Sequence, residues 1–175
     1  MTFAEGALAA ALVFVAALLQ VTLVASLDVA GGAADLLLLV LVAVALLRGS
    51  LTGAVAGFFG GLLVDVTTLD TLGVSALLSA LLGYWVGRYG ETTGRDRAHA
   101  PIVAVLVATV GVAYGGYGLH FLIGDDISAR RALFDTLLPT IALNLLLGRP
   151  VFMLCRSLLG RTAAPEAATE VRLFG

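Results

Sequence analysis

The amino-acid sequence predicts an all-α fold: a polytopic membrane bundle of six transmembrane helices. Hydrophobic residues make up 60 % of its 175 residues, charged residues only 13 %, and the mean hydropathy is +1.05. A soluble domain has about 25 % charged residues, and one of about 150 residues still exposes roughly 30 % of its chain surface to water. This chain has too few polar residues to cover such a surface, so a water-soluble fold is excluded.

Charge and cysteine content exclude two further classes of protein. The net charge is −2 and the sequence shows no basic stripe, which argues against nucleic acid as a partner. A scaffold held by disulfides is excluded because Cys155 is the single cysteine.

Apolar runs account for most of the chain. A helix needs about 20 mostly apolar residues to cross roughly 30 Å of hydrocarbon. The polar segments between and after the runs are too short to hold a separate domain, so we expect one integral membrane domain, residues 1–175. The expected spans are about 7–27, 31–47, 49–65, 71–87, 101–124 and 132–149, with a cytoplasmic tail at 160–175.

The first run is expected to be a span rather than a cleaved signal peptide. No basic residue precedes it, and its 21 residues exceed the 7–15 of a signal core. The second and third runs are joined only by Arg48-Gly49-Ser50. They form either a crossing helical hairpin or a re-entrant pair, and the flanking charges favour crossing.

The arginines predict the orientation. Cytoplasmic loops carry an excess of Lys and Arg, and this chain has no lysine. With six spans and a cytoplasmic N-terminus, eight arginines fall inside and two, Arg130 and Arg131, fall outside. Both termini are therefore expected in the cytoplasm.

A series of small residues marks the third run. Gly49, Gly53, Gly57 and Gly61 follow one another at intervals of four, so they share one helix face. Small residues let helix backbones approach closely in lipid. The face therefore packs against a neighbouring helix of this chain or receives a partner.

Polar residues within the runs suggest specific contacts. Gln20 and Asn144 are expected to form hydrogen bonds between helices. Asp35 stands where it can cap the second helix. Asp65 is either a solvated helix end or an inward-facing acid that binds neighbouring helix ends or a partner. Pro150 is expected to break or kink the last helix.

No constellation of catalytic or metal-binding residues is visible in the sequence. His99 and His120 fall on opposite sides of the membrane, and no metal-binding spacing of His or Cys occurs. The serines lack the Gly-x-Ser-x-Gly setting of a nucleophile. We therefore expect no enzyme activity, no cofactor and no metal.

The order and spacing of particular residues in the first half resemble a known family. They are Gln20, Asp35, Gly57, Phe58, Gly61, Asp65, Leu72, Gly73, Ala76, Gly83 and Tyr84. This pattern resembles the rod shape-determining protein MreD family. Within it, the resemblance marks Gly57, Gly61, Asp65 and Gly73 as family-signature positions.

The resemblance implies a non-enzymatic component of the bacterial cytoplasmic membrane that helps to control cell shape and lateral peptidoglycan synthesis. Its implied partners are an MreC-like bitopic protein, a complex of RodA with a class-B penicillin-binding protein, MreB indirectly, and membrane lipid. The implied fold is similar to the substrate-binding subunit of energy-coupling-factor transporters. The alternative function is that of such a vitamin-binding subunit. The residues expected to bind a partner or pack helices are Gly49, Gly53, Gly57, Gly61, Asp65, Gly73, Asp35 and Gln20.

Overall fold

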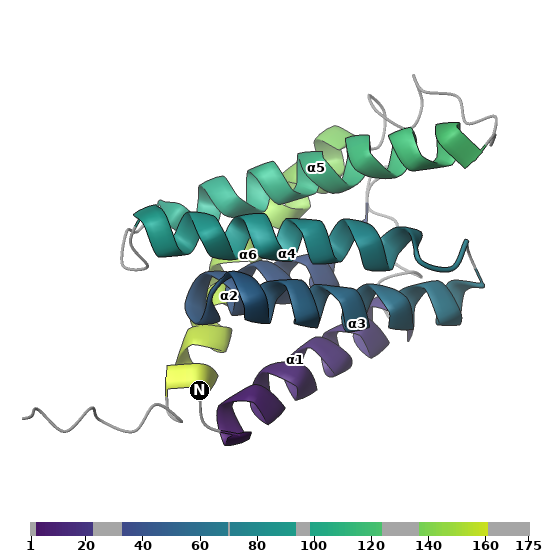
Figure 1. Cartoon of the computed structure of the whole chain (residues 1–175). Helices are drawn as coiled ribbons and strands as arrows, with labels where there is room; N and C mark the ends of the chain where they lie inside the picture. The colour runs from purple at the N-terminus through teal and green to yellow at the C-terminus, as the bar shows by residue number, and fades with distance from the viewer. Residues whose placement is uncertain (1–2, 23–32, 70, 94–98, 124–136, 161–175) are drawn as a thin grey trace, which may run out of the picture.

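The computed structural model describes residues 3–22, 33–69, 71–93, 99–123 and 137–160 (Figure 1). Within these ranges the chain forms six helices, which confirms the all-helical class. They are α1 (Phe3–Thr22), α2 (Leu36–Arg48), α3 (Ser50–Thr68), α4 (Val74–Thr93), α5 (Ala100–Ile123) and α6 (Leu137–Gly160).

Four of the helices, α1, α3, α5 and α6, are long and apolar enough to cross a membrane. This supports a bundle embedded in lipid. Of the other two, α2 has 13 residues and a length of about 20 Å at 1.5 Å per residue, and α4 carries Arg88 and Glu91 near its C-terminal end.

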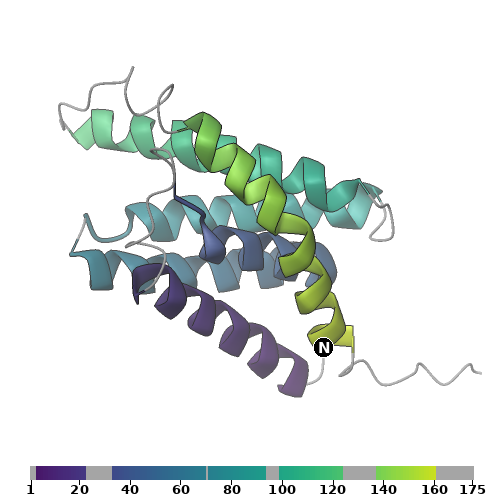
Figure 2. The ribbon, with the colours of Figure 1, turned by 180° about the vertical axis from the view of Figure 1, so that it is seen from behind.

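The short helix α2 forms the core of the bundle. It is apolar on every side, as expected of a helix enclosed by others. It contacts all five of the other helices, and Figure 2 shows it between α1 and α6. Leu39, Leu41 and Val44 are among the largest fully buried side chains.

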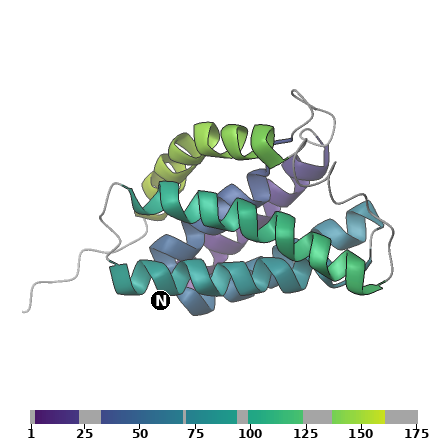
Figure 3. The ribbon, with the colours of Figure 1, turned by 90° about the horizontal axis from the view of Figure 1, so that it is seen from above.

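Two pairs of helices, α3 with α4 and α5 with α6, surround α2 together with the separate helix α1. α3 and α4 run side by side as an antiparallel hairpin (Figure 1), and α5 packs on both α4 and α6 (Figure 3). α1 crosses α3 obliquely, so the two helices diverge along part of their length (Figure 1).

Several helix ends differ from the sequence prediction. α4 begins at Val74 rather than at residue 71, and it continues to Thr93. α6 runs through Pro150 to Gly160 without a break, although it changes direction along its length (Figure 2). Proline removes one backbone donor, and membrane helices tolerate this where neighbouring groups compensate.

Some parts of the sequence prediction lie outside the described residues. These are the end of the first span at 23–27, the start of the last span at 132–136, Arg130, Arg131 and the tail at 161–175.

Candidate functional site

The backbones of α3 and α4 touch along the glycine face of α3. A Cβ atom on Gly57 would collide with the carbonyl oxygen of Ser79 and lie 2.6 Å from its carbonyl carbon. A Cβ atom on Gly61 would lie 2.6 Å from the carbonyl carbon of Ser75. Since real Cβ atoms essentially never come within 3.0 Å of such atoms, only glycine fits at either position.

The opposing face of α4 is built in the same way. A Cβ atom on Gly53 would lie 2.9 Å from the carbonyl carbon of Gly83, and one on Gly83 would lie 2.5 Å from that of Gly53. A Cβ atom on Gly87 would lie 2.5 Å from Cα of Ser50. Small residues on both helices thus produce one continuous close contact.

Asp65 joins the end of α3 to the start of α4. Its side chain is almost fully buried, with 1 % of the residue exposed. Oδ2 accepts hydrogen bonds from the N–H groups of Gly73 (2.8 Å) and Ala76 (3.2 Å), and Oδ1 accepts one from Ser75 (3.2 Å). The carboxylate therefore caps the N-terminus of α4, and the interpretation of Asp65 as a solvated helix end is wrong.

Gly73 makes this cap geometrically possible. Its φ angle is +100°, a conformation that residues with a Cβ atom rarely adopt. This turns the chain so that the Gly73 N–H points at Asp65. The eight-residue spacing between Asp65 and Gly73 therefore covers the end of α3 and the turn that brings the Gly73 N–H back to the carboxylate.

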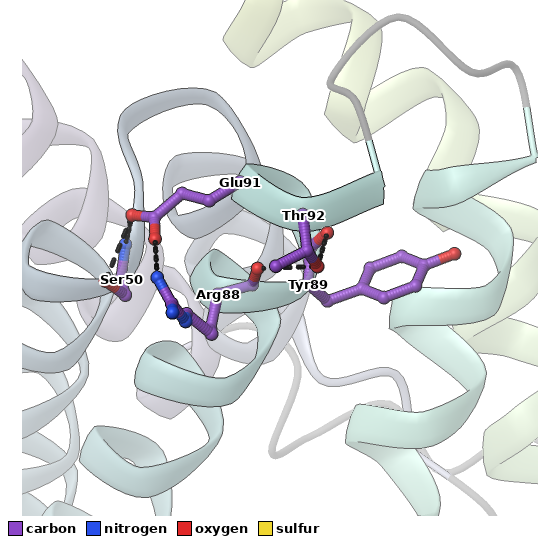
Figure 4. Close-up of polar contacts among 5 residues, drawn as sticks. All are labelled: Ser50, Arg88, Tyr89, Glu91 and Thr92. Atoms are coloured by element: carbon purple, nitrogen blue, oxygen red, sulfur yellow. Dashed lines mark hydrogen bonds and ion pairs between the residues drawn. The ribbon is translucent and has the colours of Figure 1, made fainter.

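At the opposite end of the hairpin, a carboxylate of α4 caps α3. Glu91 of α4 accepts hydrogen bonds on Oε1 from the backbone N–H (2.8 Å) and the hydroxyl (3.0 Å) of Ser50, the first residue of α3 (Figure 4). Arg88 lies 3.4 Å from its other carboxylate oxygen. Each helix of the hairpin therefore supplies the carboxylate that caps the other. Glu91 was not among the predicted site residues, since only the antiparallel register of α3 and α4 brings it to Ser50.

Gly49 lies at the end of the glycine face but just outside α3, and a Cβ atom on Gly87 of α4 would lie 2.6 Å from the Gly49 carbonyl carbon. It lies between α2 and α3, outside both helices, with a φ angle of +98°. Regular spacing placed it on the helix, but its backbone conformation ends α2 and redirects the chain into α3. Gly60 faces α1 and α2 rather than α4, since a Cβ atom there would meet Val13 and Leu37.

The cap at Glu91 predicts a dependence of stability on pH. Hydrogen bonds from Ser50 and the nearby Arg88 guanidinium hold the pKa of Glu91 below its ordinary value, which is about 4.3. A lowered pKa stabilises the fold in full above the unfolded value, and this contribution is lost as the pH falls through the folded value. We expect Glu91→Gln to lower the unfolding midpoint at pH 7, because glutamine keeps an acceptor oxygen but loses the charge. The difference from wild type should shrink as the pH falls below about 4.3, the ordinary value, because the folded carboxylate then takes up a proton. A difference that does not shrink on acidification would contradict this role.

A cluster of polar side chains surrounds the N-terminus of α2. Asp35 caps the helix through a 2.9 Å hydrogen bond from the Leu38 N–H to Oδ1. The Leu36 N–H donates to Gln20 Oε1 (2.7 Å), and the Asp35 N–H donates to Asn144 Oδ1 (2.8 Å). Gln20 and Asn144 thereby tie α1 and α6 to α2, which are the interhelical hydrogen bonds expected for both amides.

Asn144 extends this cluster to a fourth helix. It is fully buried, and its Nδ2 donates to the hydroxyl of Thr109 on α5 (3.0 Å). A cavity of about 160 Å³ adjoins the cluster and is lined in part by Asp35, Thr109, Thr140 and Asn144. Within the described residues no group of three His, Cys, Asp or Glu side chains is placed to hold a metal ion.

The C-terminus of α2 also ends in polar contacts. Arg48 forms an ion pair with Glu5 of α1 at 2.8 Å, with both side chains largely buried. Its guanidinium also donates to the carbonyl oxygen of Leu159 near the end of α6 (3.0 Å). No local pattern predicts this pairing, because Arg48 and Glu5 are two single charges far apart in the chain.

Helix composition and the site together define the class of protein. The chain is an all-helical membrane protein in which Gly57, Gly61, Asp65 and Gly73 close one helical hairpin. A family model described as rod shape-determining protein MreD matches residues 3–158, and the chain belongs to that family. Membership confirms the resemblance and implies a role in determining rod shape. Searches of curated proteins and of solved structures give no significant match.

Proposed function

We propose that this protein is a non-enzymatic membrane scaffold of the bacterial wall-elongation complex. In this function it binds an MreC-like bitopic protein and acts with RodA and a class-B penicillin-binding protein, and indirectly with MreB, to control lateral peptidoglycan synthesis. It contacts membrane lipid and requires no cofactor.

One observation carries this proposal. Gly57, Gly61, Asp65 and Gly73, the positions that bear the family resemblance, all serve to close the α3–α4 hairpin. Glycines admit a neighbouring backbone, and the carboxylate of Asp65 is occupied by three N–H groups. Residues used in this way produce a rigid surface, which is what a scaffold needs.

The proposal includes a membrane topology. Residues 1–175 form a single integral domain of the cytoplasmic membrane with six spans and both termini in the cytoplasm. In this arrangement α2 and α4 complete the set of spans, with α2 shielded from lipid by the other helices. A likeness to the substrate-binding subunits of energy-coupling-factor transporters belongs to the same proposal.

The transporter function is not favoured by any specific observation. Small-molecule pockets measure about 300–1,000 Å³ and carry a few polar groups that fix the ligand. The polar cavity beside Asp35 and Asn144 measures only about 160 Å³. A larger groove between α1 and α3 measures about 860 Å³, and among its described lining residues Thr52 has the one polar side chain. The scaffold function is therefore the one proposed.

Affinity purification tests this proposal directly. The tagged protein, extracted in mild detergent from its own host, should co-purify with an MreC-like protein and a class-B penicillin-binding protein. An unrelated tagged membrane protein of similar size is the control for nonspecific capture. Recovery of paired ATPases with a membrane coupling subunit would instead assign the protein to a transporter.

A further inference from the structure

The polar cluster at the N-terminus of α2 adjoins a cavity that the α3–α4 hairpin does not use. The cavity measures about 160 Å³, and a water molecule takes about 30 Å³ of liquid volume. It therefore has room for one small ion with a few water molecules. Four of the described residues that line it carry side-chain oxygens: Asp35, Thr109, Thr140 and Asn144.

The cavity lies inside the bundle, within the apolar length of α5. Thr109 is the tenth of the 24 residues of that helix, and its Ile123 end lies about 21 Å further on. Only 3 % of Thr109 and 0 % of Asn144 are exposed. A charge at such a depth is costly, and an ionisable residue there is a functional-site hypothesis by default.

Asp35 brings to this cavity a carboxylate with an unused oxygen. Oδ1 accepts a hydrogen bond from the Leu38 N–H (2.9 Å), whereas Oδ2 accepts none from the described residues. Asp65, the buried carboxylate of the hairpin, differs in this respect because its two oxygens accept three N–H groups. Asp35 therefore keeps an acceptor oxygen for a ligand.

The charge of Asp35 is not balanced by a cationic side chain, since none occurs among the described residues that line the cavity. Arg48 lies at the other end of α2, about 20 Å along the helix, and pairs with Glu5 at 2.8 Å. The positive end of a helix dipole is equivalent to about half an elementary charge, so about half of the carboxylate charge remains. An ion of single charge would balance it, whereas a divalent ion would leave an excess of positive charge.

The other lining oxygens are of the kinds that bind a hard cation, which are carboxylate, amide and hydroxyl oxygens. Asn144 Oδ1 accepts one hydrogen bond, from the Asp35 N–H (2.8 Å), and Thr109 Oγ1 accepts one, from Asn144 Nδ2 (3.0 Å). Each of these oxygens has a second lone pair. Thr140 adds a further hydroxyl. Such a set needs no cluster of His, Cys or acidic ligands, which the described residues do not provide.

We propose that this cavity binds a monovalent alkali cation. Asp35 supplies the charge, Thr109, Thr140 and Asn144 supply neutral oxygens, and water molecules fill the remaining space. These residues belong to the N-terminus of α2 and to α5 and α6, so the ion joins three helices inside the bundle. The inference goes beyond the scaffold function and depends on no partner.

The unfolding midpoint of the purified full chain in detergent tests the inference. It is measured in sodium, potassium or N-methylglucamine chloride, at equal ionic strength and pH. A ligand that binds only the folded state raises its stability. At a concentration about tenfold above the dissociation constant, we expect sodium or potassium to raise the midpoint by about 3–6 °C relative to N-methylglucamine, an organic cation too large for the cavity.

Asp35→Asn removes the charge and keeps the helix cap, since asparagine caps helices about as well as aspartate. We expect this variant to fold and to lose the dependence on alkali cations. Thr140→Val, which removes one lining hydroxyl, should raise the dissociation constant by about tenfold. Glu91→Gln is the matched control, because it changes a helix-capping carboxylate that does not line the cavity. It should keep the full cation dependence.

The outcomes also identify the ion. A higher midpoint in sodium than in potassium would support a sodium site, and the reverse a potassium site. Equal midpoints in all three salts would overturn the inference, as would a cation dependence that Asp35→Asn retains. A wild-type midpoint that rises on acidification equally in all three salts would show that a proton neutralises Asp35 in place of an ion, which also overturns it. Failure of an MreC-like protein to co-purify would overturn the scaffold function and leave the cation site intact.

Discussion

Replacing Gly57 by leucine should prevent α3 and α4 from packing and lower the unfolding midpoint more than any other single change considered. A side chain there collides with the carbonyl oxygen of Ser79, and two helix backbones cannot yield as a flexible side chain can. Overpacking costs about 1–3 kcal/mol and sometimes more, and contact between backbones places this variant at or above the upper end. Thermal unfolding in detergent measures the effect.

Gly118→Leu is the matched control for this prediction. A Cβ atom on Gly118 meets nothing within 4 Å, and replacing a helical glycine favours the helix by up to about 1 kcal/mol. We expect this variant to unfold at or above the wild-type midpoint and to restore rod shape in cells that lack the native protein. If Gly57→Leu also keeps the wild-type midpoint and restores rod shape, the close contact of α3 with α4 is not required.

Asp65→Asn should produce the second large loss. The three N–H groups of Gly73, Ser75 and Ala76 lose a charged acceptor, and the new amide group brings an N–H donor towards them. A hydrogen bond to a charged group contributes about 1.5–3 kcal/mol, so we expect a destabilisation of about 3 kcal/mol. Urea or thermal unfolding in detergent measures it.

Glu91→Gln is the natural comparison for Asp65→Asn, because it changes the other cap of the same hairpin. Its carboxylate is far more exposed, so solvent screens the interaction and the loss should be smaller. Partner binding adds a second measurement. If Asp65→Asn unfolds at the wild-type midpoint but no longer binds the MreC-like protein, Asp65 acts by contacting the partner rather than by capping α4.

The positions of the helices were predictable because long apolar runs separated by turn or polar residues mark helices, and four of the helices are long and apolar enough to cross the hydrocarbon. Each of the six predicted runs contains most of one observed helix. Their ends were less predictable. Gly73, with its positive φ angle, is the last residue of the turn before α4, and Pro150 is accommodated within α6.

The hairpin site was predictable in part. A spacing of four places Gly53, Gly57 and Gly61 on one face, but periodicity does not say which helix covers that face. The Asp65 side chain finds its partners only where the turn at Gly73 brings the chain back to the end of α3. No local sequence pattern predicts that position. The Arg48 ion pair with Glu5 joins helices whose contact arises only from the tertiary fold.

Both polar ends of α2 are completed by α6. One end needs Asn144 to accept from the Asp35 N–H, and the other needs the Leu159 carbonyl to accept from Arg48. Both groups belong to α6, the last helix in the described part of the chain. Without α6, the Asp35 N–H lacks its Asn144 acceptor, and Arg48 keeps its ion pair with Glu5 but lacks the Leu159 carbonyl. The arrival of α6 therefore stabilises the centre of the bundle, and a chain truncated before α6 is expected to unfold at a lower midpoint than the full chain.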